Sequence, residues 1–235
     1  MNPANSSLFN CIVNKGAIEK TDALNLYTKI WKSINENASE RTFEQLGEAI
    51  STINSKISKF DQKIVEIEYE LPEAEGTYLA FVSCTESSID KLQTFWTQAE
   101  VELFRLMIRK FMAQDECCSS IIQCMNLAPE IKVQTITKAK VEEAIRKWIN
   151  LGYFYEMDEK LYFGPRLIAE FSTSLLTQFK DQVDICDICK AIVFWGPRCG
   201  SCEEVFHKIC IQKYLDRIQS CPTCKGAFGL TEQSD

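Results

Sequence analysis

The segment that decides the fold lies near the C-terminal end, where residues 186–224 read CDICKAIVFWGPRCGSCEEVFHKICIQKYLDRIQSCPTC. It contains seven of the twelve cysteines and the only histidine of the chain. These eight residues form four pairs, each with two residues between its members: Cys186/Cys189, Cys199/Cys202, His207/Cys210 and Cys221/Cys224. Such a spacing lets two side chains reach one tetrahedral zinc ion from a tight turn. Four pairs in so short a segment indicate two structural zinc sites.

The order of the ligands predicts how the four pairs combine. In the RING and PHD fingers, which share this order, the first and third pairs hold one zinc, and the second and fourth pairs hold the other. We therefore expect a first site of Cys186, Cys189, His207 and Cys210, and a second site of Cys199, Cys202, Cys221 and Cys224. Four protein ligands leave no open position for an activated water, so we expect the metal to fold the segment and not to catalyse.

Residues between the ligands favour a RING over a PHD finger. A PHD finger usually carries an aromatic residue two positions before its seventh ligand, where this chain has Gln219. A RING usually has an apolar residue inside its first pair and a proline inside its last, and these are Ile188 and Pro222. The fourth ligand is Cys202, where common RINGs have histidine. We therefore predict a variant RING, with a PHD-like histone reader as the alternative.

A RING would bind a ubiquitin-conjugating enzyme through a small apolar platform and a nearby cation. The expected contact residues are Ile188, Trp195, Tyr214, Leu215, Pro222 and Lys225. Lys225 directly follows the eighth ligand, the position of the cationic linchpin in many RINGs. Lysine lacks the forked donor geometry of arginine, so we expect Lys225 to be a weak linchpin. Such a domain accelerates transfer by restricting geometry, and it needs no nucleophile of its own.

Composition and charge bound the remaining possibilities. The 235 residues allow two or three small domains, and the formal net charge is −7. Residues 181–235 carry six basic and eight acidic side chains, which leaves twenty basic and twenty-five acidic for residues 1–180. Neither part has the basic excess of a nucleic-acid-binding domain.

The sequence also bears on the compartment. The first residues, MNPANSSLFN, do not resemble a secretory signal, and no apolar stretch is long enough to span a bilayer. Cysteine residues that bind a metal must stay reduced. We therefore expect a cytosolic or nuclear protein without a membrane segment.

The first eighty-eight residues change from a helical period to an alternating one. Apolar residues recur every three or four positions in residues 23–34 and 43–60, as in amphipathic helices. Residues 65–71 then alternate apolar and acidic side chains, and after a turn residues 77–84 form a second, more apolar segment. Helices followed by a two-stranded hairpin predict a winged-helix-like domain over residues 1–88.

The same order repeats in residues 89–180. The expected elements are helices at 95–112, 119–127 and 137–151, a hairpin of 153–155 with 161–163, and a last helix that begins at Gly164-Pro165. The predicted fold is therefore α+β: winged-helix-like domains at 1–88 and 89–180, a variant RING with two zincs at 181–228, and a frayed tail at 229–235.

The motifs together resemble the non-SMC element 1 family, the variant-RING subunits of the structural maintenance of chromosomes 5–6 complex. The resemblance spans nearly the whole chain and is most specific in ICDIC, RCGSCEEVFHKIC, CPTC and the helix–GYF–hairpin segment before them. It implies a RING-type ubiquitin ligase that works with a MAGE-family partner bound to the winged-helix region. It also implies a nuclear role in DNA repair and chromosome maintenance. Some relatives have a longer charged tail, which this sequence lacks.

Two other functions remain open from the residues alone. The zinc segment could be a non-catalytic module that docks the subunit into its assembly. A nucleic-acid contact could form on the expected helix at 137–151, which carries Lys138, Lys140, Arg146 and Lys147. Glu142 and Glu143 lie among these cations, so a solvated helix face is the favoured interpretation.

Overall fold

The computed structural model describes residues 1–35, 39–84, 96–114 and 116–229, and it places them in three parts. We call residues 1–84 unit A, residues 96–182 unit B, and residues 183–229 the zinc domain. The predicted α+β class is confirmed, with the two mixed units followed by a small cysteine-rich domain. The predicted boundary at residues 88/89, and all of the predicted tail 229–235 except Gly229, lie outside the described residues. Along the described chain no helix is long and apolar enough to cross a membrane.

Unit A packs three helices against a three-stranded antiparallel sheet. Its elements in chain order are α1 (Pro3–Lys15), β1 (Ala17–Glu19), α2 (Lys20–Ile34), α3 (Phe43–Ile57), the 3₁₀ turn η1 (Ser58–Phe60), β2 (Gln62–Tyr69) and β3 (Gly76–Ser83). The sheet order is β1-β3-β2. The core contains Leu8, Ile12, Tyr27, Leu46 and Ile53, which three helices bring together.

Unit B repeats this order of elements. They are α4 (Gln98–Met112), β4 (Cys118–Ser120), α5 (Ile121–Met125), the 3₁₀ turn η3 (Ala128–Glu130), α6 (Lys138–Asn150), β5 (Phe154–Met157), β6 (Lys160–Phe163) and α7 (Pro165–Gln178). The sheet order β4-β6-β5 matches that of unit A. Its core is rich in aromatic rings, with Trp96, Phe104, Trp148 and Phe154 in mutual contact.

Local sequence explains where several of these helices begin. Thr42, Thr97 and Ser120 each accept a hydrogen bond from the third backbone N–H of the following helix. The side chain of that third residue returns a bond to the cap in all three cases, which forms a capping box. The helices expected at 95–112 and 137–151 were thus confirmed, with starts a few residues later or at the cap.

Each sheet holds one strand more than the expected two. β1 pairs with β3, and β4 pairs with β6, both antiparallel. β1 and β4 are only three residues long, too short to show an alternating pattern, so the two-stranded prediction was incomplete. The hairpins themselves are confirmed, as β2 with β3 and β5 with β6.

Two glycines let the units approach each other closely. Gly16 and Gly152 both have left-handed backbones, with φ of 68° and 73°. A Cβ on Gly16 would lie 1.8 Å from the carbonyl oxygen of Leu151, and one on Gly152 would lie 2.8 Å from Cβ of Ala17. Any side chain at either position would therefore force the units apart.

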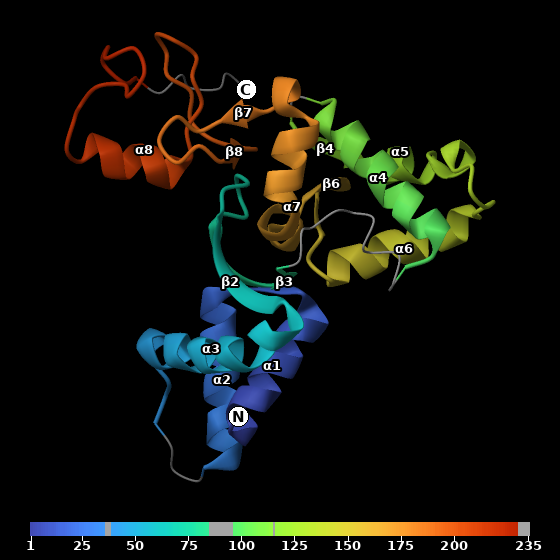
Figure 1. Ribbon diagram of the computed structural model, residues 1–235, viewed down its shortest axis with the longest axis vertical. Helices are drawn as coiled ribbons and strands as arrows, with labels where there is room; N and C mark the ends of the chain where they lie inside the picture. The colour runs from blue at the N-terminus through green and yellow to red at the C-terminus, as the bar shows by residue number, and fades with distance from the viewer. Residues whose placement is uncertain (36–38, 85–95, 115, 230–235) are drawn as a thin grey trace.

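The zinc domain contains β7 (Asp184–Ile185), β8 (Ile192–Val193), η4 (Lys180–Gln182) leading into it, and one helix, α8 (Lys208–Leu215). Its own core is small and centres on Phe206, with Val193, Val205 and Ile211 around it. Figure 1 shows the β2–β3 hairpin of unit A, in teal, extending from its helices to the zinc domain, in orange and red. Tyr69 near the end of β2 is buried, and its hydroxyl donates to the carbonyl of Phe163 in unit B at 2.9 Å. The hairpin thereby joins all three parts.

Candidate metal centres

The structure gathers the eight expected ligands into the two expected groups. Cys186, Cys189, His207 and Cys210 form one group, and Cys199, Cys202, Cys221 and Cys224 form the other. Within each group one potential ligand atom per residue lies within 4.8 Å of all the others. The grouping is interleaved along the sequence, so the two sites tie three loops and one helix into a single block.

The three Cys-x-x-Cys turns share one backbone geometry. The carbonyl of the first cysteine accepts from the N–H four residues on, at 2.7 Å for Lys190, 2.8 Å for Glu203 and 3.1 Å for Lys225. Each of those three residues has a left-handed backbone with φ of 62°. This conformation strains a non-glycine residue by about 1–2 kcal/mol, and here it closes each turn so that both sulfurs face one point.

The third pair, His207 and Cys210, reaches its site from the first turn of α8. His207 is the N-cap residue of the helix and Cys210 lies three positions later, so both side chains project from the same face. Nδ1 of His207 lies 3.2 Å from Sγ of Cys189 and 3.9 Å from Sγ of Cys210. Nε2 lies 3.0 Å from the carbonyl oxygen of Ile192. Donation from Nε2 to that carbonyl leaves the lone pair of Nδ1 free to bind a metal.

Backbone N–H groups favour thiolates at one cysteine of each site. Burial raises the pKa of Cys186, but N–H groups of Cys189, His207 and Ile188 outweigh it and bring the pKa to about 7. In the second site the N–H of Ser201 is the main cause that lowers the pKa of Cys199 to about 7. A divalent cation would compensate the charge of further thiolates in each group. The donor set of sulfur and imidazole nitrogen is the one that zinc prefers.

Three of the six expected enzyme-contact residues, Ile188, Pro222 and Lys225, lie at the surface of the zinc domain. Ile188 is 36% exposed on the first turn, and Pro222 is half-buried on the last. Thr223 donates to the carboxylate of Asp187 at 2.9 Å, so these two turns are joined side by side. Lys225 is exposed, and its ammonium donates to the carbonyl of Pro222 at 2.6 Å.

Tyr214 and Leu215 are partly buried at the end of α8, where they pack against the zinc-domain core. Their exposed edges border the surface, but much of each side chain supports α8. They therefore serve the fold of the domain at least as much as any contact surface.

Trp195 contacts the other two units. Its ring packs against Tyr69 of unit A and Tyr162 of unit B, with centroids 5.6 and 6.3 Å apart. Its indole N–H donates to the carbonyl of Glu116 at 3.3 Å. Trp195 is half-buried in these contacts, so it holds the zinc domain against the other two units, and a contact with a conjugating enzyme stays a prediction.

Two functional contacts escaped the sequence analysis. Asp187 joins the first and last turns through Thr223, and Glu70 accepts from the N–H of Ile209 at the start of α8 at 3.3 Å. Asp187 could have been noticed because it lies inside a ligand pair. Glu70 carried no such signal, because 139 residues separate it from its partner.

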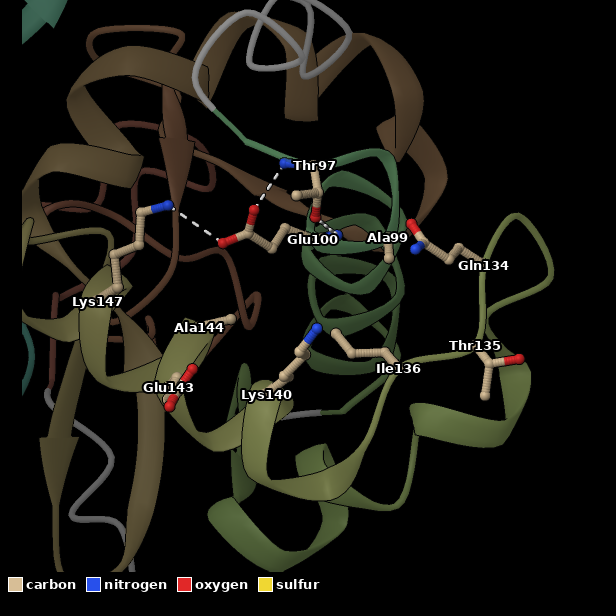
Figure 2. A pocket seen from close by; sticks show the side chains of 10 residues that line it. All are labelled: Thr97, Ala99, Glu100, Gln134, Thr135, Ile136, Lys140, Glu143, Ala144 and Lys147. Carbon is tan, nitrogen blue, oxygen red and sulfur yellow. Dashed lines mark hydrogen bonds and ion pairs between the residues drawn. The ribbon is translucent and has the colours of Figure 1, made fainter.

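The basic face of α6 is largely paired. Arg146 bonds Glu142 at 2.7 Å, Lys147 bonds Glu100 at 3.1 Å, and Lys138 donates to Asn126 at 3.3 Å. A cavity of about 320 Å³ lies between α6 and the start of α4, and Figure 2 shows the Lys147–Glu100 pair beside it. Two lysines and two glutamates line this cavity, so their charges cancel. These contacts support the solvated-face interpretation of α6.

Comparison with known proteins agrees with the architecture. The family described as Nse1 non-SMC component of SMC5-6 complex matches residues 5–171, and a RING-like domain family matches residues 186–224. The chain is 31% identical over 182 residues to the Drosophila melanogaster non-structural maintenance of chromosomes element 1 homolog, covering 77% of each chain. It is 26% identical to the Homo sapiens homolog over 216 residues, which cover 91% of this chain and 79% of the relative.

A solved structure shares the fold over the whole length. A chain of an Nse1-Nse3-Nse4 complex superposes with a TM-score of 0.76 and 20% identity, covering 99% of both chains. The fold comparison extends across both units and the zinc domain together. On these findings, the chain belongs to the family of Nse1, the non-SMC component of the SMC5-6 complex.

Proposed function

We propose that this chain is a RING-type ubiquitin ligase subunit that holds a ubiquitin-loaded conjugating enzyme in a geometry open to attack by a substrate lysine. The observation that carries the proposal is the joined pair of turns with Ile188 and Pro222 at the surface. Ile188 and Pro222 lie on two turns that a hydrogen bond joins, so the two apolar side chains can be contacted together by one partner protein. Restricting the geometry of the thioester accelerates attack without any catalytic side chain.

Two zinc ions would occupy the two ligand groups and stabilise the domain, supplying positive charge to the thiolates. The other contributions come from the residues of the chain. In each Cys-x-x-Cys turn a residue with a left-handed backbone brings both sulfurs toward one metal position. The hydrogen bond from Thr223 to Asp187 fixes the spacing of Ile188 and Pro222. Lys225 lies beside Pro222, where its ammonium would reach toward enzyme and ubiquitin.

The assembly around this subunit follows from its relatives. A superposable chain belongs to an Nse1-Nse3-Nse4 complex, and the matching family is a component of the SMC5-6 complex. We propose that units A and B bind a MAGE-family subunit within such an assembly, and that the subunit acts in the nucleus in DNA repair and chromosome maintenance. Direct nucleic-acid contact is not needed for this role.

The proposal is tested by single-turnover discharge of ubiquitin from a panel of conjugating enzymes, with and without a MAGE-family partner. We expect the zinc-loaded chain to accelerate discharge, and Ile188→Ala to abolish most of that acceleration. In the assays without the partner, Ile122→Ala is the matched control, because it truncates an isoleucine that is 69% exposed on unit B. If Ile188→Ala loses the acceleration and Ile122→Ala keeps it, the apolar surface at Ile188 is the one that binds the conjugating enzyme.

A docking role is the second candidate, and the position of Trp195 favours it. Part of the zinc-domain surface already packs against units A and B through this ring. A purely structural domain would not need an exposed Ile188. If no enzyme of the panel is stimulated by a chain verified to hold two zincs, with or without the partner, the ligase proposal fails and the docking role stands.

A further inference from the structure

Helix α8 has an N-terminus that its own N-cap residue does not cap. The first backbone N–H groups of a helix lack partners within the helix, and a side chain at the N-cap position usually accepts from them. Here that residue is His207, which makes no capping hydrogen bond. Its Nδ1 faces the thiols of the first site, and its Nε2 is engaged by the carbonyl of Ile192. The imidazole therefore has no atom left for capping.

A carboxylate from unit A accepts a hydrogen bond from the start of α8 in place of the N-cap side chain. Oε1 of Glu70 accepts from the N–H of Ile209, the second residue of α8, at 3.3 Å. A negative charge at this position also interacts favourably with the helix dipole. A few residues along the same hairpin, Glu75 accepts from the ammonium of Lys208, the first residue of α8, at 2.6 and 2.8 Å. Two acidic side chains of unit A thus hold both residues that begin the helix.

The contact between Glu70 and Ile209 is partly buried at the junction of unit A and the zinc domain. Tyr69, next to Glu70, is buried and contacts Trp195 of the zinc domain. Among the described residues the second carboxyl oxygen of Glu70, Oε2, is buried without a hydrogen-bond partner. Burial is the main cause that raises the pKa of Glu70 to about 7, against the N–H groups of Ile209 and Lys208, which lower it. A carboxyl group kept in such surroundings is held there by the bond that it makes to α8.

We propose that Glu70 is a remote N-cap of α8 that couples the hairpin of unit A to the first metal site. The metal holds His207 and Cys210 on the first turn of α8, and Glu70 holds the N–H groups of the same turn. Docking of the hairpin therefore tightens metal binding at the first site. By linkage, metal at the first site tightens docking by the same factor. The coupling exists whether or not the zinc domain binds a conjugating enzyme.

Among the described residues, the second site has no such connection to unit A. Its four cysteines lie in two turns, and the backbone hydrogen bonds of those turns run to Glu204, Gly226 and neighbouring residues of the zinc domain itself. The coupling should therefore be confined to the site that contains His207. That asymmetry distinguishes a specific link from a general loss of stability.

The test is amide hydrogen exchange, resolved by residue, on the full-length zinc-loaded chain. We expect Glu70→Ala to speed exchange in the first turn of α8 and at the N–H of Lys190 in the first-site turn. The expected acceleration is between about twofold and thirtyfold, the range for loss of an N-cap. Exchange at Glu203 and Lys225, in the turns of the second site, should stay at the wild-type rate.

Two further variants give the controls. Glu73→Gln changes an exposed carboxylate in the same hairpin turn that makes no hydrogen bond or ion pair with the described residues, and it should match the wild type. Glu70→Gln keeps the accepting oxygen and should stay close to the wild type. Unchanged exchange at the buried amides of α4 verifies that each variant is folded.

Equal exchange in Glu70→Ala and Glu73→Gln would overturn the proposal. Equal acceleration at both metal sites would overturn it as well, because the effect would then be general. Glu75→Gln provides a second approach if Glu70→Ala fails to fold: it breaks only the exposed pair with Lys208. It should produce a smaller acceleration in the same first turn, and no change there would also contradict the coupling.

Discussion

The two metal sites have the same number of ligands but different connections to the rest of the protein. The second site consists of two turns, and Cys199 and Cys221 are fully buried within the zinc domain. The first site combines one turn with the start of α8, and that helix is held by Glu70 and Glu75 of unit A. Ligand count alone would make the sites equivalent. The difference teaches that one site stabilises its own domain, whereas the other also fixes that domain on the body of the protein.

Removal of the Tyr69 ring should have the largest effect on this difference. Tyr69→Ala deletes a buried ring that contacts Tyr78, Tyr155 and Trp195, and also the bond to the carbonyl of Phe163. We expect a loss of about 3 kcal/mol in the free energy of unfolding, as for other buried aromatic truncations. Denaturant unfolding measures the loss. Amide exchange should show the first-site turn loosened and the second-site turns unchanged, and equal loosening would contradict the comparison.

The pH dependence of stability tests the role of Glu70, and we expect a smaller effect than that of Tyr69→Ala. Burial raises the pKa of Glu70 in the folded chain to about 7, above the 4.5 that is ordinary for a glutamate, and the nearby Glu75 and Glu68 raise it further. A raised pKa contributes stability that is fully present below the unfolded value and is lost as the pH rises through the folded value. We therefore expect the free energy of unfolding to fall as the pH rises from about 4.5 to about 7, because burial disfavours the charged carboxyl group, and denaturant unfolding at each pH measures the fall.

The same series on Glu70→Gln is the control. Glutamine does not titrate, so this contribution to the fall in the free energy of unfolding should disappear in the variant. A fall of the same size in Glu70→Gln would assign the pH dependence to another group.

The smallest expected effect concerns two surface lysines, one on the first-site turn and one on the last turn of the second site. Lys190 and Lys225 occupy the same left-handed position after the first and last turns, both with φ of 62°. Only Lys225 lies next to Pro222, to whose carbonyl it donates. If the chain is a ligase, Lys225→Arg should raise the rate of ubiquitin discharge a few-fold, because a guanidinium makes two directed bonds where an ammonium is a point charge.

Lys190→Arg is the matched control for that substitution and should leave the discharge rate unchanged. Its ammonium is engaged by Asp187 at 2.6 Å on the first turn. An equal gain from both arginines would indicate a general effect of charge geometry, and no gain from Lys225→Arg would remove Lys225 as a linchpin.

Much of the architecture could be predicted from the sequence because the decisive signals are local or regularly spaced. The paired ligands with Cys186 and His207 among them, the helical periods, and the alternation before Tyr69 each lie within a short window. The interleaved grouping was predictable from ligand order, and the structure agrees with it. The α+β class followed from the change of period.

The remainder depends on contacts between distant segments, which no window contains. Trp195 has the composition and position of a platform residue, but its ring packs against Tyr69 and Tyr162. Glu70 looks like one more exposed acid in an alternating strand, yet it meets a helix 139 residues away. Only the packing of the hairpin between unit B and the zinc domain decides either role.

The most direct test of the account is the rate of zinc release from each site in wild type and Glu70→Ala. Release to an excess of chelator can be followed site by site through the NMR signals of Cys210 for the first site and Cys221 for the second. We predict faster release from the first site alone in Glu70→Ala, by at least about twofold. Identical release from the first site in both proteins would show that unit A does not support this metal centre, and the asymmetry between the two sites would be lost.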